Sequence, residues 1–178
     1  MRLRTLATAA STLTLLAATL ATAAPARADD DPLLCTGSVT VHYDPPLGAV
    51  PRQTSQSVTE NLGTSGGGTC TGPLTSGTAH TVFDQQVSCL FQGLGDTLVE
   101  NVVTYHWQNG QSSTITYPVT VVEHAAGQEV VTSVGTVTAG YGLGAASTRV
   151  AAYPSLDLLS CLGSTTTQQS GLLTLTIT

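Results

Sequence analysis

Apolar and polar residues alternate along most of the chain, and no stretch repeats with the period of an amphipathic helix. An alternation of period two places successive side chains on opposite faces of a β-strand. In the first such stretch, Val39, Val41 and Tyr43 share one face, and Thr40 and His42 share the other. The same reasoning predicts strands over residues 35–43, 53–62, 79–91, 99–107, 115–121, 128–139, 149–153 and 173–177.

The clearest pair of strands surrounds Asn109-Gly110, a dipeptide typical of two-residue hairpin turns. The alternation predicts that Ile115, Val119 and Val121 share one face of the return strand. Pro118 indicates an edge position for that strand, because proline has no N–H to donate to a neighbouring strand.

Seven to nine short strands separated by turns predict an all-β, immunoglobulin-like two-sheet sandwich with two disulfides, and a closed barrel is the alternative. The predicted core includes Val39, Val41, Val103, Tyr105, Trp107, Ile115, Val119 and Val121.

The first 28 residues have the order of a secretory signal peptide. A short positive start is followed by an apolar stretch and then by the cleavage pattern Ala26-Arg27-Ala28. Threonine and serine dilute the apolar stretch, which favours a cleaved leader over a membrane-spanning helix. We therefore expect a secreted, extracellular protein with a single domain over residues 29–178.

Removal of the leader leaves Arg52 and Arg149 as the basic residues, against eleven acidic residues and no lysine, for a net charge of −9. Such a charge disfavours nucleic acid and anionic membranes as partners.

The four cysteines, Cys35, Cys70, Cys89 and Cys161, predict two disulfides in an exported protein. No pair has the close spacing of zinc ligands. Three pairings are possible, and we favour Cys35–Cys70 with Cys89–Cys161.

The sequence has no clear catalytic motif. The segment Gly63-Thr64-Ser65-Gly66-Gly67 resembles the nucleophile segment of trypsin-like proteases, but threonine replaces the aspartate. His80 also follows Ser65, whereas the histidine of that family precedes the serine. The four histidines are scattered singly, so we predict no metal site, no cofactor and no enzymatic activity.

Several segments are similar to those of small secreted actinobacterial β proteins, and together they cover nearly the whole mature domain. They are Cys35-Thr36-Gly37, Tyr43-Asp44-Pro45-Pro46-Leu47, Gly68-Thr69-Cys70, Ser88-Cys89-Leu90, Trp107-Gln108-Asn109-Gly110-Gln111-Ser112, the segment from Val134 to Gly140, and the Cys161 segment before the last strand. Among such proteins the chain resembles the adaptor subunit of the umbrella toxin particles of streptomycetes. That resemblance implies a role in interbacterial competition, in which an adaptor joins a lectin-bearing subunit to a toxin-bearing subunit.

The function expected from these observations is a non-catalytic module that binds another secreted protein. The partner-binding segment implied by the resemblance is Asp29, Asp30, Asp31, Pro32, Leu33 and Leu34, with Leu33 and Leu34 buried in the partner's cleft. The alternatives are a protease inhibitor, which would use the loop at residues 44–52 or 63–72, and a carbohydrate-binding domain.

Overall fold

The computed structural model describes residues 31–89, 101–156 and 166–178. Most of this part of the chain is β-strand, which confirms the all-β prediction. The nine strands found there are β1 (Leu33–Leu47), β2 (Arg52–Gly63), β3 (Cys70–Thr71), β4 (Ser76–Val87), β5 (Asn101–Trp107), β6 (Ser112–Ala125), β7 (Gln128–Gly140), β8 (Ala146–Pro154) and β9 (Thr166–Ile177).

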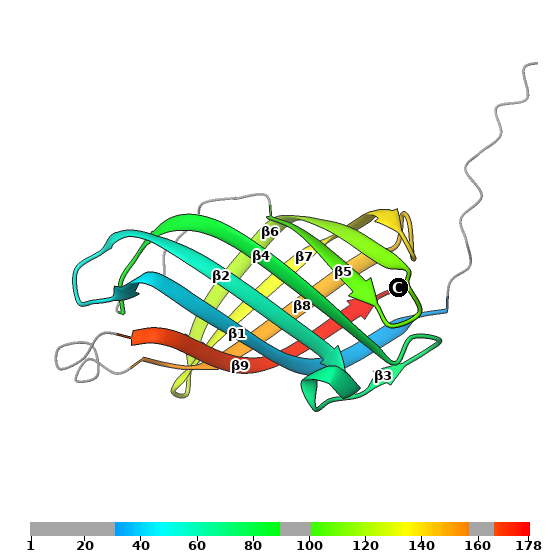
Figure 1. Ribbon diagram of the computed structural model, residues 1–178, viewed down its shortest axis with the longest axis horizontal. Coiled ribbons are helices and arrows are strands. Elements are labelled where there is room, and N and C mark those ends of the chain that lie inside the picture. Colours follow the sequence, from blue (N-terminus) through cyan, green and yellow to red (C-terminus); the bar gives the residue numbers. More distant parts are fainter. Residues whose placement is uncertain (1–30, 90–100, 157–165) are drawn as a thin grey trace, which may run out of the picture.

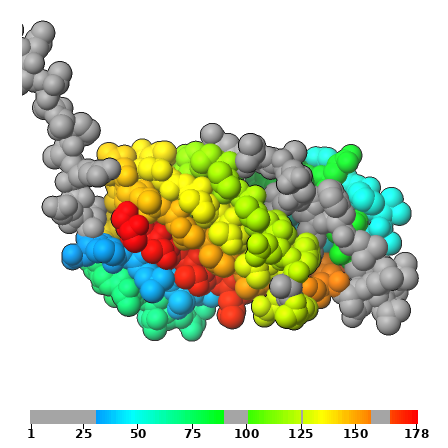
Figure 2. Space-filling view, turned by 180° about the vertical axis from the view of Figure 1, so that it is seen from behind, coloured from blue at the N-terminus to red at the C-terminus, as the bar shows by residue number. Residues whose placement is uncertain are grey.

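The strands form a closed antiparallel barrel, so the predicted sandwich is wrong (Figure 1). Apart from the two-residue β3, the eight strands follow one another around the barrel in chain order, and β9 returns to pair with β1. The closing pair has a long register that begins at Leu33 opposite Ile177. In the view from behind, β6 to β9 lie side by side as a continuous wall (Figure 2).

The core lies inside the barrel, because every second residue of each strand points inward. Six of the eight named core residues are buried as predicted: Val39, Val41, Val103, Tyr105, Trp107 and Ile115. Val119 and Val121 are instead 43% and 49% exposed.

A β-bulge explains the two misplaced valines. The register between β6 and β7 shifts between Thr116 and Val119, so the inward face passes from Tyr117 to Thr120. Pro118 lies at this bulge and not on an edge strand, which corrects the second expectation for this segment.

One seam of the barrel is only partly closed. Within the described residues, β4 pairs with β5 at two positions, Gly77 opposite Trp107 and Thr78 opposite His106. On its other side, β4 pairs with β2 along its whole length, from Ser76 to Val87. From their paired end, β4 and β5 diverge toward the other end of the barrel (Figure 1).

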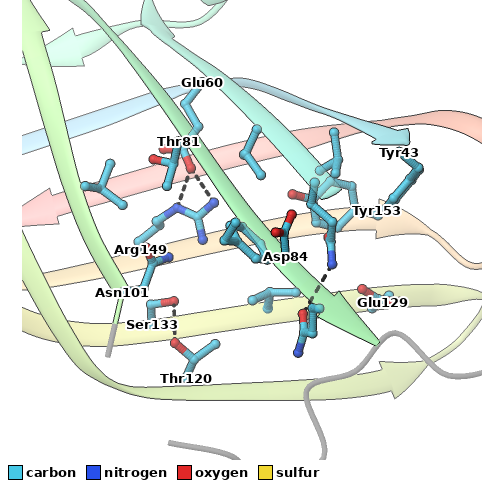
Figure 3. Close-up of a pocket in the computed structure, with 17 residues that line it drawn as sticks. Tyr43, Glu60, Thr81, Asp84, Asn101, Thr120, Glu129, Ser133, Arg149 and Tyr153 are labelled. Atoms are coloured by element: carbon cyan, nitrogen blue, oxygen red, sulfur yellow. Dashed lines mark hydrogen bonds and ion pairs between the residues drawn. The ribbon is translucent and has the colours of Figure 1, made fainter. Parts of the chain in front are cut away.

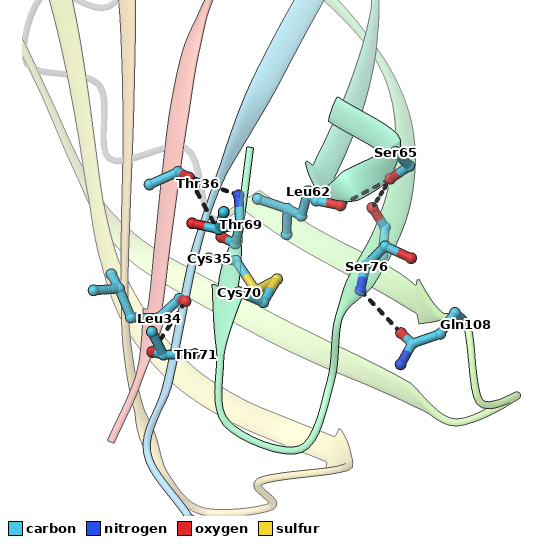
Figure 4. Close-up of a disulfide and its surroundings, with 11 residues drawn as sticks. Leu34, Cys35, Thr36, Leu62, Ser65, Thr69, Cys70, Thr71, Ser76 and Gln108 are labelled. Atoms are coloured by element: carbon cyan, nitrogen blue, oxygen red, sulfur yellow. Dashed lines mark hydrogen bonds between the residues drawn. A yellow bond between two sulfur atoms is a disulfide. The ribbon is translucent and has the colours of Figure 1, made fainter. Parts of the chain in front are cut away.

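A disulfide joins Cys35 of β1 to Cys70 of β3, which confirms one of the two favoured pairs (Figure 4). The Thr36 hydroxyl donates to the Thr69 carbonyl, and the Thr71 hydroxyl donates to the Leu34 carbonyl. These bonds hold β3 against β1 on both sides of the disulfide.

The second favoured pair stays a prediction, because Cys161 lies outside the described residues. Cys89 is buried and has no disulfide partner among the residues that are described.

Structural disulfides are typical of proteins that fold outside the cytosol. No helix in the described part of the chain is long and apolar enough to cross a membrane.

Candidate functional site: a polar cavity inside the barrel

A cavity of about 180 Å³ lies inside the barrel, beside the part of the β4–β5 seam where the described residues of the two strands do not pair (Figure 3). Phe83 of β4 and Val103 of β5 line it from the two sides of this seam. The rest of the lining comes from β1, β2, β6, β7 and β8. It combines the aromatic rings of Tyr43 and Tyr153 with amide, hydroxyl and carboxylate groups.

An ion pair is buried in the wall of this cavity. Arg149 of β8 donates from Nε to Glu60 Oε1 at 2.7 Å, and its Nη2 donates to the same oxygen. The Tyr105 hydroxyl donates to Glu60 Oε2 at 2.5 Å. The side chains of Arg149 and Glu60 are only 7% and 3% exposed, so bulk water contributes little to their solvation.

Burial and the ion pair determine the protonation states here. Burial alone would lower the pKa of Arg149. The negative charge of the adjacent Glu60 carboxylate has a larger, opposite effect, so the pKa of Arg149 is raised above its ordinary value. Burial, reinforced by the negative charge of Glu60, raises the pKa of Tyr105 well above its ordinary value. The guanidinium is therefore charged and the phenol neutral at physiological pH.

Strand alternation places both charged residues inside the barrel. Glu60 falls between the buried Val58 and Leu62 on the inward face of β2. Arg149 falls between the buried Ser147 and Ala151 on the inward face of β8. This alternation is visible in the sequence, so the inward position of Glu60 and Arg149 could have been predicted from it.

A second carboxylate, that of Glu129, lies at another part of the lining. Its side chain is 5% exposed and approaches Nε2 of His124 at 3.3 Å, whereas the His124 side chain is 60% exposed. Burial raises the pKa of Glu129, and the adjacent His124 opposes this shift. Glu129 is thus a buried acid whose partner, His124, is largely exposed to solvent.

Polar side chains around the cavity are held by bonds to one another. The Tyr43 hydroxyl donates to Gln169 Oε1 at 2.9 Å, and Gln56 Nε2 donates to Gln85 Oε1 at 3.2 Å. The hydroxyls of Thr120 and Ser133 are 3.1 Å apart. These bonds fix the orientation of the lining before any ligand enters, which lowers the entropic cost of binding.

The described part of the expected partner-binding segment, from Asp31 to Leu34, leads directly into Cys35 of the disulfide. Asp29 and Asp30 are outside the described residues. The Asp31 carbonyl accepts a hydrogen bond from the Tyr141 hydroxyl at 3.2 Å. Leu33 is fully buried in the barrel's own core. It is therefore not available to the partner's cleft in which we expected it to be buried. Leu34 is 43% exposed and remains accessible, and the role of the segment as a whole stays a prediction.

The two residues of the protease-like motif lie on different elements. Ser65 is in the 3-10 turn at Thr64–Gly66, and its hydroxyl donates to the Leu62 carbonyl at 2.8 Å (Figure 4). His80 is exposed on β4, and its Nδ1 lies 3.3 Å from the Thr59 hydroxyl. In the described residues, no three His, Cys, Asp or Glu side chains are grouped so that they could hold a metal ion.

Comparisons with protein-family models, with curated proteins and with solved structures find no match for this chain.

Proposed function

We propose that this protein binds a small organic molecule in the cavity of its barrel. The observation that carries the proposal is the cavity itself, which lies behind the unpaired part of the β4–β5 seam and is lined by aromatic and polar groups. Eight-stranded barrels are wide enough either to be filled by side chains or to hold one small ligand. The cavity of about 180 Å³ supports the second of these arrangements.

The volume limits the size of the ligand. A dry cavity of roughly 150 Å³ is enough to hold benzene, and the present cavity is slightly larger. Its capacity corresponds to one ring with a short polar substituent. Tyr43, Phe83 and Tyr153 offer rings against which such a molecule could pack, and the bordering amides offer donors and acceptors for its substituent.

A pair of matched variants tests the proposal. Val58→Phe adds bulk at an inward position that lines the cavity, whereas Val82→Phe adds the same bulk at a 58% exposed position on the outside of β4. We expect benzyl alcohol and benzylammonium, used as single-ring probes, to shift the NMR methyl signals of Val103 and Val131 in the unmodified protein. The Val82→Phe variant should retain these shifts, and the Val58→Phe variant should lose them.

Absence of binding by any single-ring probe, charged or neutral, would contradict the proposal. Equal binding by the two folded variants would also contradict it, because it would place the probe outside the barrel. Mass spectrometry of organic extracts from protein purified out of culture supernatant would identify a ligand that is retained from the source.

A second proposed role is the binding of another secreted protein, as in an adaptor of a toxin particle. The supporting observation is a group of exposed valines on the outer surface: Val119 and Val134 lie directly opposite each other on β6 and β7, and Val121 lies nearby on β6. Exposed apolar side chains that gather on one face are typical of protein-binding surfaces. Recovery of a partner from supernatant by the unmodified protein, and its loss with Val119→Asp, would support this role. Unchanged recovery would exclude this face.

A further inference from the structure

Among the residues that the structure describes, no buried cation balances the buried carboxylate of Glu129. Its side chain is 5% exposed, and among the described residues only His124 bonds to it, through Oε2. Because His124 is 60% exposed, its imidazole shares its charge with water and compensates the burial of Glu129 only in part. The raised pKa of Glu129 is consistent with this incomplete compensation, since the largest cause of the shift is burial of the carboxylate.

Two aromatic rings line the same part of the cavity as this carboxylate and offer a further surface for a positive charge. Tyr153 lies directly opposite Glu129 in the β7–β8 register, and Tyr43 reaches the same part of the lining from β1 (Figure 3). The face of an aromatic ring carries partial negative charge and attracts cations. Burial raises the pKa of Tyr153 to about 12, so this ring carries a neutral phenol at physiological pH.

The positive charge in the lining is already neutralised. Arg149 is the cationic side chain of the described lining, and its Nε and Nη2 both donate to Glu60 Oε1. The remaining carboxylates of the lining are Glu129 and Asp84. An anion that entered the cavity would meet these two carboxylates without a free cation to receive it, whereas a cation would relieve the uncompensated charge of Glu129.

We propose that the ligand of this cavity is an organic ammonium ion, with its charged group between the Glu129 carboxylate and the rings of Tyr43 and Tyr153. This inference rests on the proposed ligand-binding function and adds the chemical class of the ligand. The ammonium group donates hydrogen bonds to Glu129, and the apolar body of the ligand lies toward Val58, Phe83 and Val103. A metal ion fits less well, because hard cations need several oxygen ligands and the described residues hold no such group.

Three probes of the same shape separate charge from size: benzylammonium, benzyl alcohol and benzoate. We expect the unmodified protein to bind benzylammonium about tenfold or more tightly than benzyl alcohol, and benzoate most weakly, as measured by calorimetry. The variant Glu129→Gln keeps the volume of the side chain and removes its charge. It should bind benzylammonium and benzyl alcohol with similar affinity.

The matched control is Glu123→Gln, because Glu123 is exposed on β6 and does not line the cavity. It should keep the preference for benzylammonium. If benzyl alcohol or benzoate binds as tightly as benzylammonium to the unmodified protein, the ammonium proposal is wrong while the ligand-binding function stands. Retention of the ammonium preference by Glu129→Gln would likewise overturn it. Absence of binding by all three probes would overturn the ligand-binding function itself.

Discussion

At the scale of single residues, the buried pair of Glu60 and Arg149 is the most demanding feature of this barrel. Moving either charge out of water costs roughly 20 kcal/mol in the idealised limit and still several kcal/mol in a real protein. Only good geometry with additional hydrogen bonds offsets that cost. The structure meets this condition, since Glu60 accepts from Arg149 on one oxygen and from Tyr105 on the other. The pair holds the Arg149 side chain at the cavity wall and leaves it little freedom to receive an anion.

The first prediction concerns this pair. Glu60→Gln retains the shape of the side chain and an acceptor for Tyr105, but it leaves the guanidinium of Arg149 buried without an opposite charge. We expect the free energy of unfolding to fall by about 3–5 kcal/mol, measured by urea denaturation. Glu123→Gln on the exposed face should change it by less than about 0.5 kcal/mol.

A double variant separates lost attraction from stranded charge. Glu60→Leu combined with Arg149→Met removes both charges, so it should be more stable than Glu60→Gln alone. If Glu60→Gln proves as stable as the unmodified protein, the guanidinium must have another source of compensation, and our description of the pair would be wrong.

At the scale of elements, the junction of β4 and β5 depends on a close approach of backbone to ring. A Cβ atom at Gly77 would lie 2.4 Å from Cε3 of Trp107, which is closer than real contacts allow. The Trp107 ring stacks with Tyr105 at a centroid distance of 5.8 Å, and its Nε1 donates to the Ser113 hydroxyl at 2.9 Å. The ring is therefore fixed on its other sides and cannot easily move away.

The second prediction follows from this contact. Gly77→Ala should destabilise the protein by about 1–3 kcal/mol through overpacking, and it should shift the fluorescence of Trp107, the only tryptophan in the chain. Gly48→Ala is the matched control, because a Cβ there would meet nothing within 4 Å. An unchanged emission spectrum and an unchanged unfolding midpoint for Gly77→Ala would show that the seam is looser than described.

The elements themselves were largely predictable from alternation, and the bulge in β6 shows where that reasoning stops. A period of two fixes the faces only while the register holds, so one extra residue moves all later side chains to the other face. Gly135 of β7 lies opposite the bulge, and its missing Cβ leaves room for the Thr116 carbonyl, which would be 2.0 Å away. Pro118 and Gly135 together were the available signals, but each also has a simpler interpretation.

At the scale of the whole molecule, closure decides between a barrel and a sandwich, and no local pattern encodes it. The closing contact joins Leu33 to Ile177, near the first and last of the described residues, and both folds place the same residues inward. Strand length was the best indication, because β1 and β6 contain 15 and 14 residues, whereas strands of about 5–6 residues are usual in globular proteins. The sequence prediction ended these strands too early, at Tyr43 and Val121.

The cavity was harder still to foresee, because it requires residues from seven strands to meet. Glu129 is not among the candidate residues named from the sequence, because spacing along the chain cannot show that it faces Tyr43 and Tyr153. Burial depends on which strands become neighbours, so the chemistry of the site follows from the closure of the barrel. The six buried core residues, in contrast, depend only on local alternation and were predicted correctly.

The last prediction concerns the stability of the barrel in alkali, since four of its buried side chains are tyrosines whose pKa values are raised by burial: Tyr43, Tyr105, Tyr117 and Tyr153. An unfolded tyrosine ionises near its ordinary pKa of 10.0, whereas burial raises the pKa of Tyr117 and of Tyr153 to about 12. A raised pKa in the folded state means that the folded protein binds these protons more tightly. The corresponding stability is complete below pH 10.0 and is lost as the pH rises through the folded values.

We therefore expect the free energy of unfolding to decrease steadily from about pH 10 upward, by about 1.4 kcal/mol for each pKa unit at each buried tyrosine. The tyrosinate absorbance of these four residues should appear together with the loss of near-ultraviolet circular dichroism, because the buried phenols ionise only when the barrel opens. Tyr153→Phe removes one of the four groups and should make the decrease less steep. Ionisation of all the tyrosines in a barrel that keeps its native dichroism would contradict the burial of these phenols and, with it, the closed interior on which the cavity depends.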